Sequence, residues 1–204
     1  MKNYIQSYCI IKNNTVRLNG QLDYLEKNNL DFSDFSKKLY KELKLSYSKF
    51  FKMDNLSKLA FLGAEYIFRD IETKTDKNVA IVLSNRASSL DTDRKHQHSI
   101  QDKDSYYPSP AVFVYTLPNI AIGEISIRHQ LMSENAFFVF DSFNPQFLSN
   151  YADILIDKNK AESVLCGWVD YDNDQYEGFM YLVSHKGNLK HTVKELTNIY
   201  QNKE

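Results

Sequence analysis

The sequence is poor in glycine, proline and cysteine. It has six glycines, four prolines and two cysteines in 204 residues, and no internal repeat or low-complexity stretch divides it. We therefore expect a single domain over residues 1–204. Cys9 and Cys166 lie in separate apolar runs. This favours two buried free thiols over a disulfide, as is typical of a cytoplasmic protein.

The sequence also lacks an excess of charge of one sign and any long hydrophobic run. With 25 basic and 26 acidic residues, the formal net charge is -1, so we expect no electrostatic binding to nucleic acid or to an anionic membrane. No run approaches the roughly 20 apolar residues that a membrane span needs. Gln6 and Ser7 interrupt the apolar N-terminal segment, and no small-residue cleavage site follows. The segment is therefore predicted to be a first strand and not a signal peptide.

Aromatic side chains, in contrast, are abundant. The 13 Phe and 14 Tyr residues supply bulky packing units for the core of one sizeable α/β domain. From Leu56 to Ile71 the apolar residues follow helical spacing, with Asp54 or Asn55 as the candidate N-cap. Residues 79–83 form a short β-branched apolar run, which predicts a buried, parallel strand.

The rest of the chain predicts strands that alternate with helices. Further helices are predicted over residues 89–98, 144–157 and 192–200, and further strands over residues 163–169 and 178–183. Residues 13–34 are too rich in Asn and charge to assign. Residues 136–140 are apolar at every position, which predicts a strand that is buried on both faces or lies at a subunit interface. The alternation indicates an α/β fold with a mostly parallel sheet covered by helices.

Three motifs stand in order along the chain. Residues 52–60 read Lys-Met-Asp-Asn-Leu-Ser-Lys-Leu-Ala, residues 116–119 read Thr-Leu-Pro-Asn, and residues 160–170 read Lys-Ala-Glu-Ser-Val-Leu-Cys-Gly-Trp-Val-Asp. Together they resemble the N-terminal half of the β-ketoacyl-acyl-carrier-protein synthases, over roughly residues 50–184. The resemblance implies a thiolase-like fold, present here as a single N-terminal ketosynthase half. It also implies a helix over residues 119–129, where the alternating isoleucines alone would favour a strand.

The family's reactive cysteine corresponds to Ser142 in this sequence. In the family, the N-terminus of the following helix activates the thiolate, whereas a serine hydroxyl there gains little without a general base. Phe143 and Asn144 stand where the family has small residues, and the family's two catalytic histidines belong to a C-terminal half without a counterpart in these 204 residues. The resemblance thus implies a non-catalytic subunit, similar to the compact chain length factors of aryl polyene and flexirubin-type pigment systems.

Such a subunit pairs with an active ketosynthase and shapes the cavity for a chain that grows on an acyl carrier protein. The resemblance implies no cofactor. In the family, the strand before the nucleophile pairs across the dimer axis, and the segment before it projects side chains towards the partner's acyl tunnel. The implied interface and chain-gating residues are Val112, Phe113, Tyr115, Asn119, Phe137, Phe138, Val139 and Phe140. For each of them, an ordinary core position is the alternative.

Two other functions stay open. A stand-alone thiolase-like acyltransferase or hydrolase would use Ser142 as its nucleophile, although residues 140–144 lack the Gly-x-Ser-x-Gly elbow that gives such a serine its strained backbone. A homodimeric carrier-binding module would have no role in shaping a tunnel.

No metal site is predicted. The acidic stretch of residues 170–177 lacks the Gly and Glu that an EF-hand loop needs at its sixth and twelfth positions, so we expect an exposed hairpin turn. His96 and His98 have a spacing that zinc can use, but no Cys or carboxylate pattern completes the ligand set, which favours a solvated helix face. His185 and His191 flank a turn and are expected to be exposed.

Overall fold

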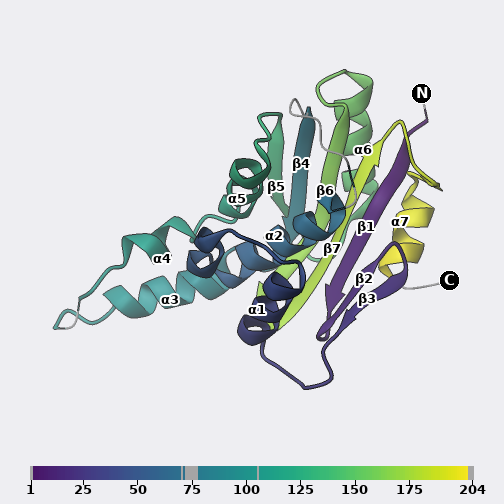
Figure 1. The fold of residues 1–204 in the computed structure, drawn as a ribbon. Helices are drawn as coiled ribbons and strands as arrows, with labels where there is room; N and C mark the ends of the chain where they lie inside the picture. Colours follow the sequence, from purple (N-terminus) through teal and green to yellow (C-terminus); the bar gives the residue numbers. More distant parts are fainter. Residues whose placement is uncertain (1, 70, 72–77, 105, 202–204) are drawn as a thin grey trace.

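The computed structural model describes residues 2–69, 71, 78–104 and 106–201, and one eight-stranded sheet forms its centre (Figure 1). The strands are β1 (Tyr4–Lys12), β2 (Thr15–Leu18), β3 (Gln21–Leu25), β4 (Val79–Asn85), β5 (Asn135–Val139), β6 (Ser163–Asp172), β7 (Gln175–Ser184) and β8 (Leu189–Lys190). Their order across the sheet is β3-β2-β1-β7-β6-β4-β5, and β8 pairs with β1.

The sheet is mixed. Strand β4 runs parallel to β5 and β6, whereas the other pairings among the described strands are antiparallel. The α/β fold is confirmed, but the expectation of a mostly parallel sheet is wrong. Parallel pairing is confined to the edge that contains β5, because β6 and β7 are joined by a tight hairpin and the N-terminal strands are joined by hairpins of their own.

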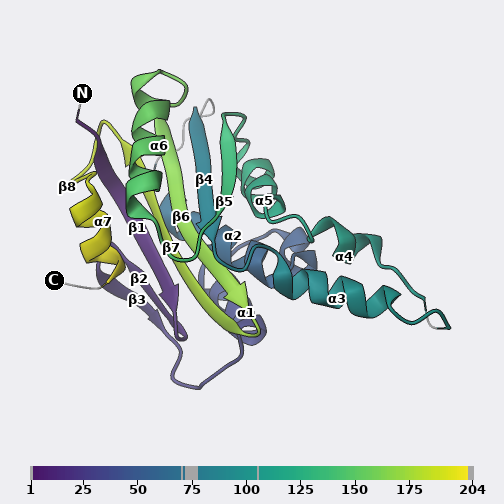
Figure 2. The same ribbon diagram turned by 180° about the vertical axis from the view of Figure 1, so that it is seen from behind.

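Helices cover both faces of the sheet and one pair projects away from it. The helices are α1 (Phe32–Glu42), α2 (Asn55–Phe68), α3 (Leu90–Ile100), α4 (Pro110–Val114), α5 (Ile120–His129), α6 (Pro145–Asp157) and α7 (Val193–Tyr200), with a short 3-10 helix at Ser48–Lys52. Helices α1, α2 and α5 enclose a first core on one face, and α6 and α7 enclose a second core on the other (Figures 1 and 2). Helices α3 and α4 extend from the body as an arm (Figure 1).

Helix α2 is the central element of the first core. Asp54 is its N-cap, with a carboxylate that accepts a hydrogen bond from the backbone N–H of Ser57 at 2.9 Å. The helix is buried around almost its whole circumference, as expected of a helix that lies between a sheet and other helices. Gly63 faces Met180 of β7, and a Cβ atom at this glycine would stand 2.5 Å from the sulfur. The missing side chain therefore lets α2 lie close to the sheet.

The unassigned residues 13–34 contain two hairpins and the start of α1. Asn13 and Asn14 turn between β1 and β2 with φ of 50° and 55°, and Asn19 and Gly20 turn between β2 and β3 with φ of 51° and 82°. Asparagine and glycine adopt this left-handed backbone most readily. Three of the five asparagines that prevented an assignment are thus turn residues.

Several sequence predictions are confirmed. Residues 119–129 form a helix, residues 79–83 lie in the fully buried strand β4, and residues 170–177 form the end of the β6–β7 hairpin, with Asn173 and Asp174 at its turn. Cys9 and Cys166 are both buried and free. In the part of the chain that the structure describes, no helix is long and apolar enough to cross a membrane.

Candidate interaction surface

The arm exposes large apolar side chains. Ser109 caps α4 by accepting from the N–H of Val112 at 3.3 Å, and Pro110 occupies the first helical turn. Phe113 is 58% exposed, with the ring of His96 on α3 at 5.2 Å between centroids. The exposed apolar residues of the arm and of the turn that follows it are Leu90, Tyr106, Tyr107, Phe113, Val114 and Leu117. Such a concentration on one projecting element is typical of a surface that binds another protein.

The four residues that the resemblance assigned to this segment differ in exposure. Phe113 and Asn119 are exposed and Val112 is half-buried, whereas only 8% of Tyr115 is accessible. The hydroxyl of Tyr115 donates to Oε1 of Glu124 at 2.9 Å. Burial, together with this hydrogen bond to a carboxylate, raises the pKa of Tyr115 well above its usual value. Tyr115 therefore occupies the core position that was its alternative.

Glu124 is a buried carboxylate at the base of the arm. It lies on α5, and its Oε2 is 2.9 Å from the ammonium nitrogen of Lys49, a half-exposed residue of the 3-10 helix. The carboxylate thus joins the end of α4 and the helix α5 to the 3-10 helix, which lies about 70 residues earlier in the sequence. Glu124 was not predicted as a site residue, although a charged residue on the apolar face of a helix that begins at Ile120 is a readable signal of a buried, paired carboxylate.

Strand β5 forms one edge of the sheet. The carbonyl oxygen of Glu134 accepts from Ile81 at 3.1 Å, and the N–H of Phe140 donates to Asn85 at 2.9 Å. In a parallel ladder, alternate residues direct both backbone groups towards one neighbour. The even-numbered residues of β5 therefore face β4, and the N–H and C=O groups of residues 135, 137 and 139 point out of the sheet edge.

The side chains of β5 lie on both faces of this edge. Phe137 packs against the first core, whereas Val139 is 53% exposed. The alternative of a strand buried on both faces is therefore wrong, because Asn135 and Val139 are exposed and the three residues between them are only half-buried. On the opposite face, Phe138 and Phe140 pack against Phe147 of α6, with ring centroids 4.7 and 5.1 Å apart.

Helix α6 continues this aromatic group along its outer side. Tyr151 lies 5.4 Å from the ring of Phe138 and 5.9 Å from that of Phe147, and Ile154, which lies one turn further along, is 58% exposed. These residues follow one another at helical spacing beside the open edge. Phe147 and Tyr151 are only half-buried, so they border a surface.

Ser142 lies in the exposed turn between β5 and α6. Asn144 caps the helix by accepting from the N–H of Phe147 at 3.0 Å. No described residue forms a hydrogen bond with the hydroxyl of Ser142, and a serine hydroxyl needs a general base to act as a nucleophile. Phe143 turns inwards, with its ring 4.6 Å from Tyr200 and 5.4 Å from Phe179. An aromatic group thus fills the space behind Ser142.

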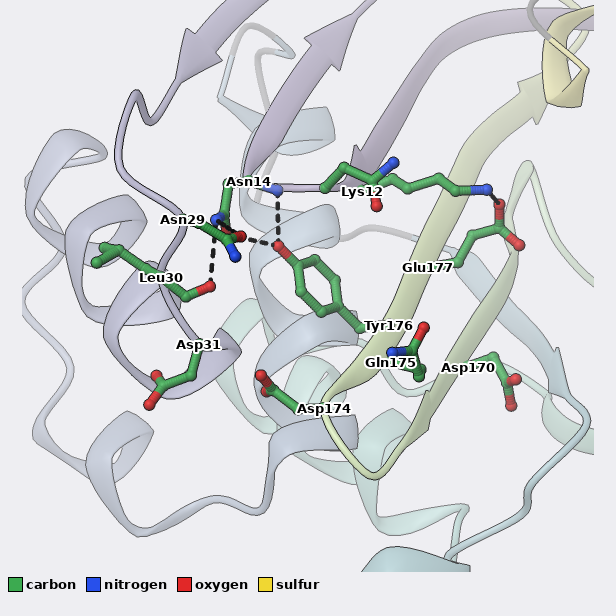
Figure 3. A pocket seen from close by; sticks show the side chains of 11 residues that line it. Lys12, Asn14, Asn29, Leu30, Asp31, Asp170, Asp174, Gln175, Tyr176 and Glu177 are labelled. Carbon is green, nitrogen blue, oxygen red and sulfur yellow. Dashed lines mark hydrogen bonds and ion pairs between the residues drawn. The ribbon is translucent and has the colours of Figure 1, made fainter.

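A hollow of about 460 Å³ lies between the β1–β2 turn, the β6–β7 turn and the loop before α1 (Figure 3). Its lining is polar. Asn14 and Tyr176 hydrogen-bond to each other across it, and Lys12 pairs with Glu177 at 2.5 Å. The carboxylate of Asp174 accepts from the N–H of Phe32. These groups are occupied by the chain's own structure, and the lining is unlike that of an acyl-chain cavity.

The histidines that were considered as zinc ligands have other contacts. His96 packs against Phe113, and His98 forms a hydrogen bond with Gln101 at 3.1 Å. Among the described residues, no group of three or more His, Cys, Asp or Glu side chains could hold a metal ion. His185 is exposed, as expected, but His191 is buried and the expectation for it is wrong. Its imidazole lies between α6 and β7, within the second core.

Solved structures of ketosynthase-like proteins share this fold. The chain superposes on the ishigamide ketosynthase/chain length factor with a TM-score of 0.63 and 15% identity, over 90% of this chain and 62% of that one. It superposes on one chain of the structure of a ketosynthase (ApeO) in complex with its chain length factor (ApeC) from Xenorhabdus doucetiae. The TM-score is 0.59 and the identity 13%, over 92% of this chain and 81% of that one.

A β-ketoacyl synthase from Burkholderia phymatum gives a TM-score of 0.61 at 9% identity, over 91% of this chain and 59% of that one. No family model and no curated protein matches the sequence. The chain therefore has the thiolase-like ketosynthase fold and spans about 60 to 80% of the length of these structures. At this level of identity, the likeness establishes the fold alone.

Proposed function

We propose that this chain is a non-catalytic ketosynthase-like subunit, a chain length factor. It pairs with an active β-ketoacyl-acyl-carrier-protein synthase and shapes the cavity for a growing acyl or polyene chain, in pigment biosynthesis of the aryl polyene or flexirubin type. The observation that carries the proposal is the open apolar edge of β5 beside an arm with exposed aromatic side chains. Two of the structures with the same fold are described as pairs of a ketosynthase and a chain length factor.

The backbone of β5 supplies the pairing. Residues 135, 137 and 139 direct N–H and C=O groups outwards that no other described strand pairs with, so a partner strand can extend the sheet by main-chain hydrogen bonds. The side chains of Phe138, Val139 and Phe140 then become buried against the partner. Apolar side chains on such a strand favour a permanent interface.

The arm supplies the contact with the acyl cavity. Phe113 and Asn119 are exposed, and Val112 is half-buried behind them, so these side chains are available to line or to block a cavity that the partner contributes. Tyr115 has an indirect role, because its hydrogen bond to Glu124 fixes the end of α4 on α5 and so positions the exposed residues of the arm. A bulky side chain at the end of a tunnel would limit chain length by steric exclusion.

The chemistry belongs to the partner. Ser142 has no base beside it in the described structure, and Phe143 occupies the space in which an acyl chain would approach. The acyl carrier protein is recognised by the complex as a whole.

The proposal is tested by co-expression with a candidate ketosynthase, followed by purification on a tag carried by one chain alone. We expect a soluble heterodimer. Val139→Lys places a charge in the paired edge and should abolish it, because an unpaired buried charge costs several kcal/mol. Leu22→Lys on β3, at the opposite edge, is the matched control, because Leu22 and Val139 are both 53% exposed. Equal pairing by both variants would refute the assignment of the edge.

The role in limiting the length of the acyl or polyene chain is tested by measuring the chain lengths of the products that the complex makes. Phe113→Ala should lengthen them, because it removes an exposed ring from the arm and leaves the core intact. Ser142→Ala should leave the rate and the product pattern unchanged. Loss of product with Ser142→Ala would instead support a serine-dependent acyltransferase or hydrolase.

A further inference from the structure

The C-terminal segment, defined here as residues 189–200, covers the second core next to α6. Strand β8 pairs with the first residues of β1, and Leu196 and Ile199 of α7 are buried. At the end of α7, the ring of Tyr200 lies 4.6 Å from Phe143 and 5.8 Å from Phe179. The segment therefore shields the aromatic group behind Ser142.

His191 fastens the start of this segment to α6. Its side chain has no accessible surface, and its Nδ1 lies 2.9 Å from Oδ1 of Asp153. The same carboxylate oxygen accepts from the side-chain amide of Asn3 at 2.7 Å. Because a carboxylate accepts and does not donate, the proton of a neutral His191 lies on Nδ1. The other nitrogen, Nε2, is buried and has no hydrogen-bond partner among the described residues.

We propose that Asp153 and His191 form an acid-sensitive clamp that holds the C-terminal segment on α6 and releases it when the imidazole is protonated. Protonation adds a second N–H group, on Nε2, and a positive charge to a ring that is closed off from water. Both changes oppose the buried position. Release uncovers Phe143 and Phe179 beside the Ser142 turn.

The groups that face His191 determine the direction of the effect. Asp153 on α6 favours the charged imidazole, and burial disfavours it more strongly, so the pKa of His191 is lowered from its ordinary value. Tyr181 of β7 lies 5.9 Å away between ring centroids, and Cys166 of β6 stands opposite Tyr181 in the sheet. Burial raises the pKa of both, so neither of them titrates in the acid range.

The sign follows from linkage. In the open segment, His191 has an ordinary pKa of about 6.5, above its value in the closed segment. The closed state is therefore fully favoured above about pH 6.5. Below that pH the open state takes up the proton first, and the opening constant rises by about tenfold per pH unit until the pKa of the closed state is reached.

Hydrogen exchange of the full chain between pH 7.5 and pH 5 tests the clamp. Protection factors of residues 189–200, corrected for the intrinsic exchange rates, should be constant above about pH 6.5 and fall by about tenfold per pH unit below it, until the pKa of the closed state is reached. The protection factors of α2 should stay constant over the whole range. His191→Asn keeps an N–H donor for Asp153 but cannot titrate, so its protection should not depend on pH in this range. His98→Asn replaces an exposed histidine of α3 and should behave like the wild type.

If the protection factors of residues 189–200 in His191→Asn depend on pH as steeply as those of the wild type, the proposal is overturned. An NMR titration of wild-type His191 with a pKa at or above 6.5 would also overturn it, because this would mean that Asp153 stabilises the imidazolium more than burial destabilises it. If His191→Asn does not fold, Asp153→Asn serves instead. Loss of the carboxylate charge should lower the pKa of His191 further, and an unchanged pKa would refute the pairing.

Discussion

Tyr115 and Phe113 lie two residues apart in the arm, and we predict opposite consequences for their substitution. Tyr115→Phe leaves the ring in place but removes the donor to Glu124, which is itself only 3% exposed. A hydrogen bond to a charged group contributes about 1.5–3 kcal/mol. Because Lys49 still reaches the carboxylate from a half-exposed position, we expect a loss of unfolding free energy of roughly 1.5–2.5 kcal/mol.

The assay is thermal and urea unfolding of the isolated chain. For a domain of this size, about 1 kcal/mol corresponds to roughly 2–4 °C in Tm, so Tyr115→Phe should lower Tm by about 3–10 °C. Phe113→Ala should change the unfolding free energy by no more than about 0.5 kcal/mol, because exposed substitutions have small effects.

A double-mutant cycle with Glu124→Gln isolates the pair. The two substitutions should not be additive, and the coupling should recover most of the effect of Tyr115→Phe. Two results would refute the distinction between a structural and an exposed aromatic residue. One is a Tyr115→Phe variant with an unchanged free energy of unfolding, and the other is a Phe113→Ala variant that is destabilised by more than about 1.5 kcal/mol.

Three further predictions concern stability. Gly123→Ala on α5 should stabilise the chain by about 0.5–1 kcal/mol, because a Cβ there meets no atom within 4 Å. Gly167→Ala should cost about 1–3 kcal/mol, since its Cβ would stand 3.0 Å from a carbonyl oxygen of β7; urea midpoints compare the two variants. For Glu65, burial raises the pKa, but hydrogen bonds from His129 and Arg128 outweigh it and hold the pKa below 4.5. Its stabilisation should be complete above about pH 4.5 and lost in more acid solution, and acid unfolding of Glu65→Gln should lack this component.

Local patterns predicted the elements that the fold buries most completely. Strand β4 has no exposed position and no charged residue, so a short apolar run was a sufficient signal. Helix α2 had both its periodicity and its capping Asp54. Helix α5 needed the family resemblance, because its isoleucines alternate like those of a strand. In the structure it ends at Gln130, which has a left-handed φ of 55°.

Other features depend on residues that are far apart in the sequence. The burial of His191 requires Asp153, 38 positions earlier, and Asn3, at the other end of the chain, so no local pattern could reveal it. The antiparallel pairing of β1 with β7 could not be predicted either, because these strands are also far apart in the sequence. The turn at Asn19 and Gly20 was in fact a readable local signal, since Asn-Gly favours a two-residue hairpin.

The two open edges of the sheet differ in a way that bears on the proposed partner. Strand β3 has two features that hinder edge-to-edge pairing. Its register against β2 shifts after Val16, and it carries the charged Asp23, which pairs with Arg69 at 2.7 Å. Strand β5 has neither, because its five residues carry no charge and it pairs with β4 without a shift. Unprotected apolar edges promote aggregation, so β5 is the edge that we expect a partner to cover. The aromatic residues of α6 beside it, including Tyr151, extend the surface that would be covered.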